Sequence, residues 1–257
     1  MTVRMTALIA LLGAGVAFAQ DGFTPKQFHL TVPVVTGGEA VAAIVAGEGQ
    51  ADLAAAAQDA VQDATGVELP IMPPEEATRD AWTEGRSFIV LGRLGSNAVV
   101  DQLYVNHYVC ADARYPGEDG HELRTVHDPW GTGASAVFLG GSDDAGVMRA
   151  IERLAEVLPE GPDVALPHTI DLAGANVPPP TSEVDVEALR ERLAGQNFRA
   201  VGSRASSGCL SYHRSGDQNH AIIAREALYR LAEIVADMPV VGDSRGVVYL
   251  PTVFDLA

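Results

Sequence analysis

The chain has 257 residues, of which 47% are hydrophobic and 20% are charged, a balance typical of a globular protein that buries a core. Its 34 Asp and Glu residues outnumber its 17 Lys and Arg residues, so the formal net charge is −17. This charge excludes a nucleic-acid partner, which would require a basic surface, and it would repel an anionic membrane.

Residues 1–19 have the three parts of a secretory signal peptide. Arg4 supplies a positive start, and residues 6–16 form an apolar stretch that is shorter than the roughly 20 residues needed to span a bilayer. The small residues Ala17 and Ala19 predict cleavage before Gln20. We therefore expect a secreted or periplasmic protein that has no membrane contact after the signal is cleaved.

The predicted elements of the mature chain begin with two strands, residues 28–35 and 40–46, on either side of a Gly-Gly turn. Residues 50–65 are Ala-rich with apolar side chains at helical spacing, and Gly66 is a stop signal, so a helix is expected there. A short strand at residues 68–71 follows.

A second group of elements begins with a buried strand at residues 87–91, after which residues 96–97 cap a short helix that ends at Tyr104. Strands at residues 122–127 and 136–139 flank a loop that is rich in Pro and Gly, which predicts two neighbouring strands joined by a tight connection.

Ser142 is expected to cap the next helix, whose apolar stripe runs from Val147 to Leu158. Strands followed by helices in this rhythm predict an α/β sandwich, a mixed sheet with helices packed on it, over residues 20–173.

A Pro-rich linker is predicted at residues 174–182, which contain three consecutive prolines. Only helical patterns follow in residues 183–257, the strongest at residues 217–237 with Glu226 and Arg230 paired on one face. We expect these helices to be the incomplete start of a larger all-α domain, because their apolar stripes would not close a core among themselves.

Two stretches carry a family resemblance. Residues 124–154, RTVHDPWGTGASAVFLGGSDDAGVMRAIERL, with TGVELPI at residues 65–71 before them, resemble the N-terminal α/β domain of exported carbohydrate-active enzymes such as α-glucuronidases and β-hexosaminidases. Residues 210–221, LSYHRSGDQNHA, are similar to helix turns in the (α/α) toroids of heparinase II/III-like polysaccharide lyases. The resemblance implies carbohydrate chemistry with its catalytic residues mainly beyond residue 257.

The strongest candidate for ligand contact combines Arg124, His127, Asp128 and Trp130. A Trp face can stack on a sugar ring, and the other three side chains can hydrogen-bond hydroxyls or a carboxylate. A structural alternative is a hairpin in which Asp128 organises the turn and Trp130 covers the sheet edge.

Other motifs favour structural roles. Residues 140–146 follow a strand and open a helix, but they lack a phosphate-loop pattern, and Asp143 and Asp144 favour helix capping. No spacing typical of a metal site or a bound cofactor occurs, and no catalytic residue is identified. Tyr212 and His213 are of the residue types used in lyase chemistry, although packing is the stronger interpretation. Cys110 and Cys209 are expected to be free or buried thiols.

The sequence thus predicts an exported carbohydrate-processing protein that acts on a polysaccharide or oligosaccharide. It would be the largely non-catalytic N-terminal part of a polysaccharide lyase or glycoside hydrolase. The alternative is a non-catalytic exported module that binds glycan or scaffolds an envelope complex.

Overall fold

The computed structural model describes residues 31–77, 81–82 and 85–236. The predicted signal at residues 1–19, the first residues of the predicted strand 28–35, and the chain after residue 236 lie outside these ranges. In chain order the elements are β1 (Thr31–Thr36), β2 (Glu39–Ala40), β3 (Ala42–Val45), α1 (Ala51–Thr65), β4 (Ile71–Met72), β5 (Ser87–Gly92), α3 (Ala98–Val105), β6 (His121–Val126), β7 (Ala136–Gly141), α4 (Asp144–Val157), β8 (Val164–Pro167), β9 (Ile170–Ala173), α5 (Val186–Ala194), α6 (Phe198–Ser215) and α7 (Gln218–Ala236).

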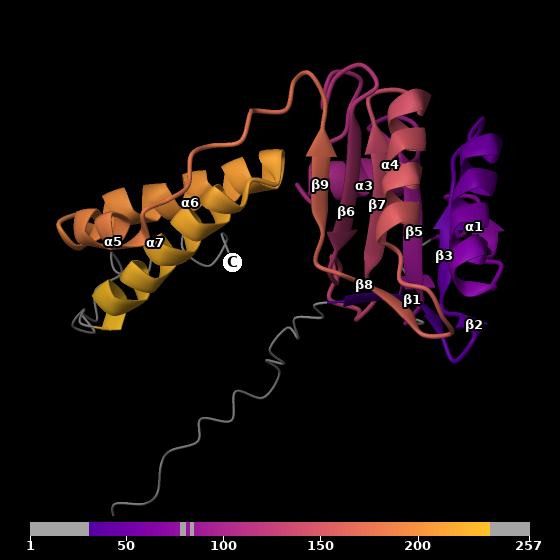
Figure 1. The fold of residues 1–257 in the computed structure, drawn as a ribbon, viewed down its shortest axis with the longest axis horizontal. Helices are drawn as coiled ribbons and strands as arrows, with labels where there is room; N and C mark the ends of the chain where they lie inside the picture. The colour runs from indigo at the N-terminus through magenta and orange to yellow at the C-terminus, as the bar shows by residue number, and fades with distance from the viewer. Residues whose placement is uncertain (1–30, 78–80, 83–84, 237–257) are drawn as a thin grey trace, which may run out of the picture.

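A six-stranded mixed sheet forms the centre of the first part, in the order β4-β3-β5-β7-β6-β9 (Figure 1). Strands β4, β3, β5 and β7 are parallel, whereas β6 runs antiparallel to both β7 and β9. Residues 127–135 join β6 to β7, which pair in antiparallel fashion, so the predicted connection between neighbouring strands is confirmed.

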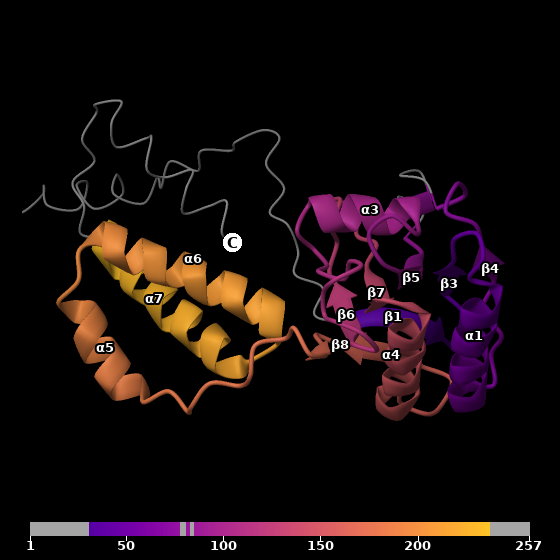
Figure 2. The ribbon, with the colours of Figure 1, turned by 90° about the horizontal axis from the view of Figure 1, so that it is seen from above.

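Helices cover both faces of this sheet. Helices α1 and α4 lie on one face and α3 on the other (Figure 2). Ile44 and Ile89 belong to the core on the α1 and α4 side, and their neighbours Val45 and Val90 belong to the core on the α3 side. Strands that are buried on both faces need continuous apolar runs, which accounts for sequences such as SFIVL at residues 87–91. The predicted α/β class with a mixed sheet is confirmed.

A second sheet of three strands, β2-β1-β8, crosses the lower end of the large sheet in Figure 1. Val32 and Val34 of β1 and Leu166 of β8 are fully buried in the core that α1 and α4 share. This small sheet therefore closes one end of that core.

Local signals fix several element ends. Gly66 ends α1 in the left-handed conformation, and the Asn97 side chain caps α3, both as predicted. The prediction that Ser142 caps α4 is wrong, because Asp143 is the cap and accepts a hydrogen bond from Gly146 N–H. The Ser142 hydroxyl instead accepts from Gly117 N–H and ties the preceding loop to β7.

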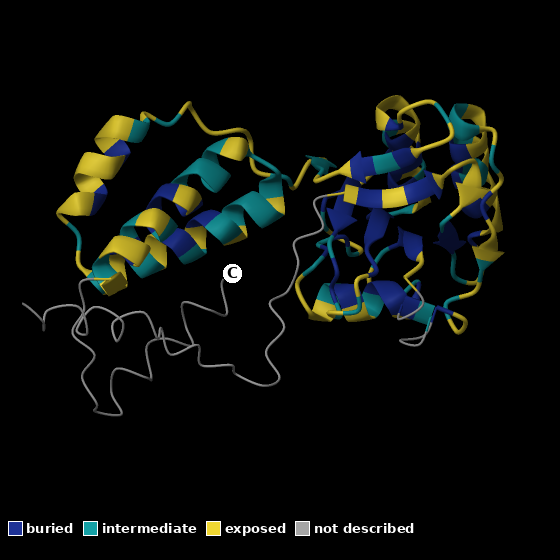
Figure 3. Cartoon of the chain, turned by 90° about the horizontal axis from the view of Figure 1, so that it is seen from below, coloured by how far each residue is buried: buried dark blue, intermediate teal, exposed yellow. Residues whose placement is uncertain are grey.

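The second part contains α5, α6 and α7, which follow a linker without helix or strand at residues 174–182. The helices share one small core, seen in Figure 3 as narrow buried faces, that comprises Leu189, Leu193, Val201, Ala205, Ala227 and Leu231. They do not by themselves show a toroid. The predicted pair of Glu226 with Arg230 is wrong: buried Glu226 binds Arg190 and Arg225, and Arg230 binds Glu233.

Candidate functional site

The four residues proposed as one ligand-contact cluster lie in three different environments. Arg124 reaches the end of α6, His127 lies beside the turn between β8 and β9, Asp128 folds the loop that contains it, and Trp130 packs in the core on the α3 side. Arg124 lies on β6 and the other three residues belong to the loop after it, so closeness in sequence did not make these residues one site.

Arg124 belongs to a buried ion pair on β6. Its Nε donates to Glu122 Oε1 at 2.5 Å, and neither side chain is more than 4% exposed. The backbone N–H of Cys110 also donates to Glu122, at 2.9 Å. A buried carboxylate of this kind is tolerated only with such partners, so Glu122 and Arg124 act as a unit.

The same guanidinium holds the end of α6. Arg124 Nη2 donates to the backbone carbonyl of His213 at 2.5 Å, and Nη1 lies 3.1 Å from His213 Nδ1. Burial, followed by the charge of Arg124, lowers the pKa of His213 to about 3. A neutral imidazole at this position can accept the Arg124 hydrogen bond. The Tyr115 hydroxyl adds a further bond to the carbonyl of Arg214.

His127 takes part in a row of polar side chains from three elements. His168 Nδ1 lies 3.3 Å from His127 Nε2, and His168 Nε2 lies 3.1 Å from the Tyr212 hydroxyl. Thr125 Oγ1 lies 3.2 Å from the same nitrogen of His127. This row brings together the end of β6, the β8–β9 turn and α6.

Asp128 has a structural role in the loop between β6 and β7. It is buried and adopts a φ of 41°, in the left-handed region that Asn and Asp tolerate better than most residues. Its Oδ1 accepts from Gly133 N–H at 2.8 Å, and its own N–H donates to Ser135 Oγ at 3.1 Å. These contacts are those of a residue that organises the turn, which is the structural alternative to ligand contact for Asp128.

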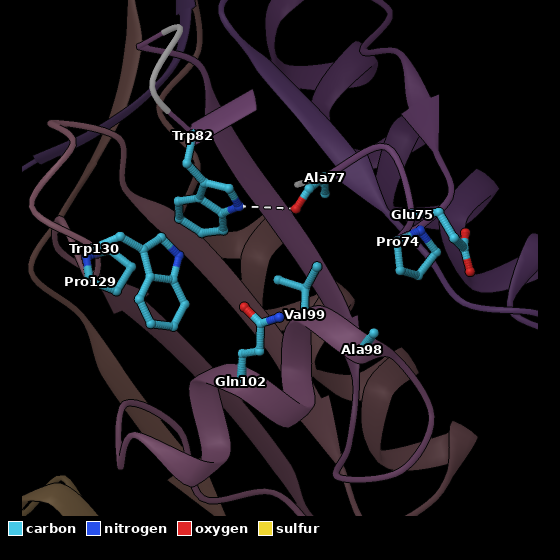
Figure 4. A pocket seen from close by; sticks show the side chains of 9 residues that line it. All are labelled: Pro74, Glu75, Ala77, Trp82, Ala98, Val99, Gln102, Pro129 and Trp130. Atoms are coloured by element: carbon cyan, nitrogen blue, oxygen red, sulfur yellow. Dashed lines mark hydrogen bonds between the residues drawn. The ribbon is translucent and has the colours of Figure 1, made fainter. Parts of the chain in front are cut away.

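Trp130 lines an open cleft of about 620 Å³ on the α3 side of the sheet (Figure 4). Its ring meets Trp82 edge to face at 6.0 Å and Tyr108 at 5.9 Å. Trp82 is almost fully buried and donates its indole N–H to the carbonyl of Ala77, whereas Trp130 is half-buried. In Figure 4 Gln102 of α3 points toward the indole rings, and Glu75 lies at the far end of the cleft.

This cleft continues into a second hollow of about 450 Å³, with which it shares Pro74, Glu75 and Ala98. The second hollow is built from the segments that follow β3, β4 and β5. These segments stand at the carboxyl ends of parallel strands, where open α/β sheets usually bind ligands. Among the described residues, the ionisable side chains that line the two hollows are the carboxylates of Glu48, Glu75 and Asp101.

Sequence reasoning did not connect His168 or His213 with Arg124 and His127. No local signal could have found them, because the pairs are separated by 41 and 89 residues. Both cysteines are free, as expected, and burial raises the pKa of Cys110 to about 12. Within residues 31–77, 81–82 and 85–236, no group of three or more His, Cys, Asp or Glu side chains could hold a metal ion.

No protein-family model matches this chain, and no curated protein matches it. Among the helices of the described residues, none has the length and apolar character needed to cross a membrane.

Proposed function

We propose that this protein is an exported carbohydrate-processing protein whose α/β part binds a glycan in the cleft that Trp82 and Trp130 help to line. One observation carries the proposal: the whole chain has two tryptophans, and both line this one cleft. Tryptophan rings offer an apolar face for a sugar ring, and Trp is enriched among the residues that dominate binding energy.

The size and lining of the cleft are suited to a sugar. Its volume falls within the usual range of small-ligand sites, about 300–1,000 Å³. Trp130 supplies the stacking surface, and Gln102 supplies an amide that can both donate to and accept from hydroxyl groups. Among the described residues that line the cleft none is basic, and on that basis we expect a neutral glycan to bind better than a uronate.

The lining also bears on the choice between enzyme and binding module. Of the described residues that line this cleft, Glu75 alone is ionisable, whereas most glycoside hydrolases need two carboxyl groups. A single carboxylate favours a binding role for this cleft. A binding role is compatible with the alternative function, a non-catalytic module that binds glycan or scaffolds an envelope complex. If the protein is a lyase or hydrolase, we place its bond-breaking chemistry outside the described residues and take α5–α7 as the start of a toroid-like domain.

Tryptophan emission tests the proposal directly, since both fluorophores lie in the cleft. We expect neutral oligosaccharides to change the emission of the wild-type chain in a saturable way, and uronate oligosaccharides to act more weakly. The Gln102→Ala variant keeps both indoles and should bind about threefold to tenfold more weakly, the scale of one lost hydrogen bond.

The matched control is Gln62→Ala, which changes an exposed amide on α1 away from the cleft. It should bind like the wild type. If no neutral oligosaccharide changes the emission, or if Gln102→Ala and Gln62→Ala bind equally well, the cleft is not a glycan site.

A further inference from the structure

His127 and His168 form a close pair, although 41 residues separate them along the chain. Their facing nitrogens, Nε2 of His127 and Nδ1 of His168, lie 3.3 Å apart, and the ring centroids are 5.4 Å apart. His127 directly follows β6, and His168 precedes β9. Since β6 and β9 pair in a fixed register from Arg124 and Ile170 onward, the sheet holds the two imidazoles together.

The separation of the facing nitrogens matches a metal chelate. The 3.3 Å separation permits a hydrogen bond between the two rings, and it is also a separation that a shared metal ion would set. Two imidazoles on one tetrahedral Zn²⁺, each at about 2.0–2.1 Å, have their nitrogens about 3.3–3.4 Å apart. We propose that His127 Nε2 and His168 Nδ1 together bind a divalent transition-metal ion such as Zn²⁺.

The other nitrogen of His168 has the partner that a metal-binding histidine requires. Nε2 lies 3.1 Å from the Tyr212 hydroxyl, which Gln218 Nε2 approaches at 3.5 Å from α7. Histidines that bind metals usually donate their second ring N–H to a neighbouring group, which fixes the ring and its tautomer. With its proton on Nε2, His168 presents the lone pair of Nδ1 toward His127.

Thr125 lets His127 exchange its partner at little cost. Thr125 Oγ1 lies 3.2 Å from His127 Nε2 and also 3.4 Å from the backbone carbonyl of Thr169. The hydroxyl hydrogen can rotate from the imidazole to that carbonyl when a metal takes the nitrogen lone pair. Thr169 N–H donates to the same oxygen at 2.8 Å and keeps it in position.

The site is open to solvent, because His168 is exposed. With two protein nitrogens, the remaining coordination positions belong to water; this is fewer protein ligands than the three of catalytic zinc sites or the four of structural ones. We therefore expect reversible binding that follows the order Cu²⁺ above Zn²⁺ for an imidazole site. This inference does not depend on glycan binding, since the Trp cleft shares no residue with it.

Calorimetric titration of the metal-free chain with ZnCl₂ tests the site. We expect one Zn²⁺ per chain, and a His168→Ala variant that binds at least about tenfold more weakly. His220→Ala, which removes a histidine on α7, is the matched control and should bind like the wild type. Absence of Zn²⁺ binding by the wild type, or equal affinity of His168→Ala and the wild type, would overturn the proposal.

Tyr212→Phe provides a second measurement that keeps both imidazoles. Loss of a partner that orients a metal-binding histidine typically costs about 10–100-fold in affinity, so we expect a loss of at least tenfold. Circular dichroism of each variant shows that the fold is intact. A Tyr212→Phe variant with wild-type affinity would contradict the geometry that we assign to His168.

Discussion

Arg124 Nη2 donates to the backbone carbonyl of His213 at 2.5 Å, a contact that joins the central sheet to the last turn of α6 across 89 residues of sequence. The last carbonyls of a helix lack partners within the helix and carry partial negative charge. A guanidinium placed there is favourable, and buried Glu122 compensates its charge on the sheet side. The two parts of the chain therefore meet through a defined polar contact.

Arg124→Met should destabilise the fold by about 3–5 kcal/mol, because it leaves the fully buried Glu122 without its ionic partner. The free energy of unfolding in urea measures this loss. The double variant Glu122→Gln/Arg124→Met, which buries no charge, should lose less than the single variant. A single variant within 1 kcal/mol of the wild type, on the scale of a surface pair, would show that the pair is not a unit.

The junction should weaken in mild acid because of His213. Its pKa is lowered from 6.5 to about 3 in the folded state, so between these values the unfolded chain binds more protons than the folded one. The contribution of His213 to the free energy of unfolding is complete above its unfolded-state pKa of 6.5 and is lost as the pH falls toward 3. His213→Asn keeps an acceptor for Arg124 without titrating, so its unfolding free energy should change less between about pH 7 and pH 4.5.

The pH interval used for His213 ends at about pH 4.5 so that it stays above the range in which Asp171 titrates. The hydrogen bond from His121, with burial opposing it, lowers the pKa of Asp171 from 3.8 to about 2. Asp171 therefore loses its contribution as the pH falls below about 4, outside the interval used for His213. Equal pH dependence of the wild type and His213→Asn in that interval would contradict the assignment.

Asp128→Asn and Asp128→Ala should differ. The amide oxygen of Asn can still accept from Gly133 N–H, and Asn tolerates the φ of 41°, so little stability is lost. Ala loses the hydrogen bond and fits the left-handed backbone poorly, which should cost about 1–3 kcal/mol. The difference between the two urea midpoints is the measurement, and equal midpoints would exclude a turn-organising role.

Glu226 should matter more than its surface neighbour Glu233. The Glu226 side chain is 2% exposed and binds Arg190 on α5 and Arg225 on α7, whereas Glu233 is 65% exposed. Glu226→Ala removes the acceptor that both guanidinium groups share and should destabilise the helical part by about 1–3 kcal/mol. Glu233→Ala should change stability by less than about 0.5 kcal/mol. Helical circular dichroism during thermal unfolding compares them.

Elements with strong local signals were predicted well from sequence. Helix α1 has both apolar periodicity and a glycine stop, and α3 has an Asn cap, so their ends fall within a residue or two of the prediction. Strands β8 and β9 were not predicted, because each has four residues and is defined by a partner far away, β1 or β6. Pairing at long range leaves no periodicity to detect in so short a segment.

The candidate site was predicted only as a set of residues. Sequence singled out Arg124, His127, Asp128 and Trp130, but it could not show that they separate into an ion-paired junction, a histidine pair, a turn and an aromatic cleft. The four residues separate into these environments because of the sheet register and the placement of α6. Both are set by contacts between distant parts of the folded chain, which the local sequence does not show. The partners that give each residue its chemistry, His213 and His168 among them, come from other elements.

The position of Gly216 has a consequence for how copies of this chain behave together. Gly216 ends α6 with a φ of 67°, and a Cβ there would lie 3.0 Å from the carbonyl oxygen of Ile170, the first residue of edge strand β9. The turn after α6 thus lies against a backbone group that could otherwise pair with a strand from another molecule. At the opposite edge of the sheet, β4 pairs through two residues. Removing α6 and α7 would uncover β9, and the shortened protein would be more prone to aggregate through its sheet edge.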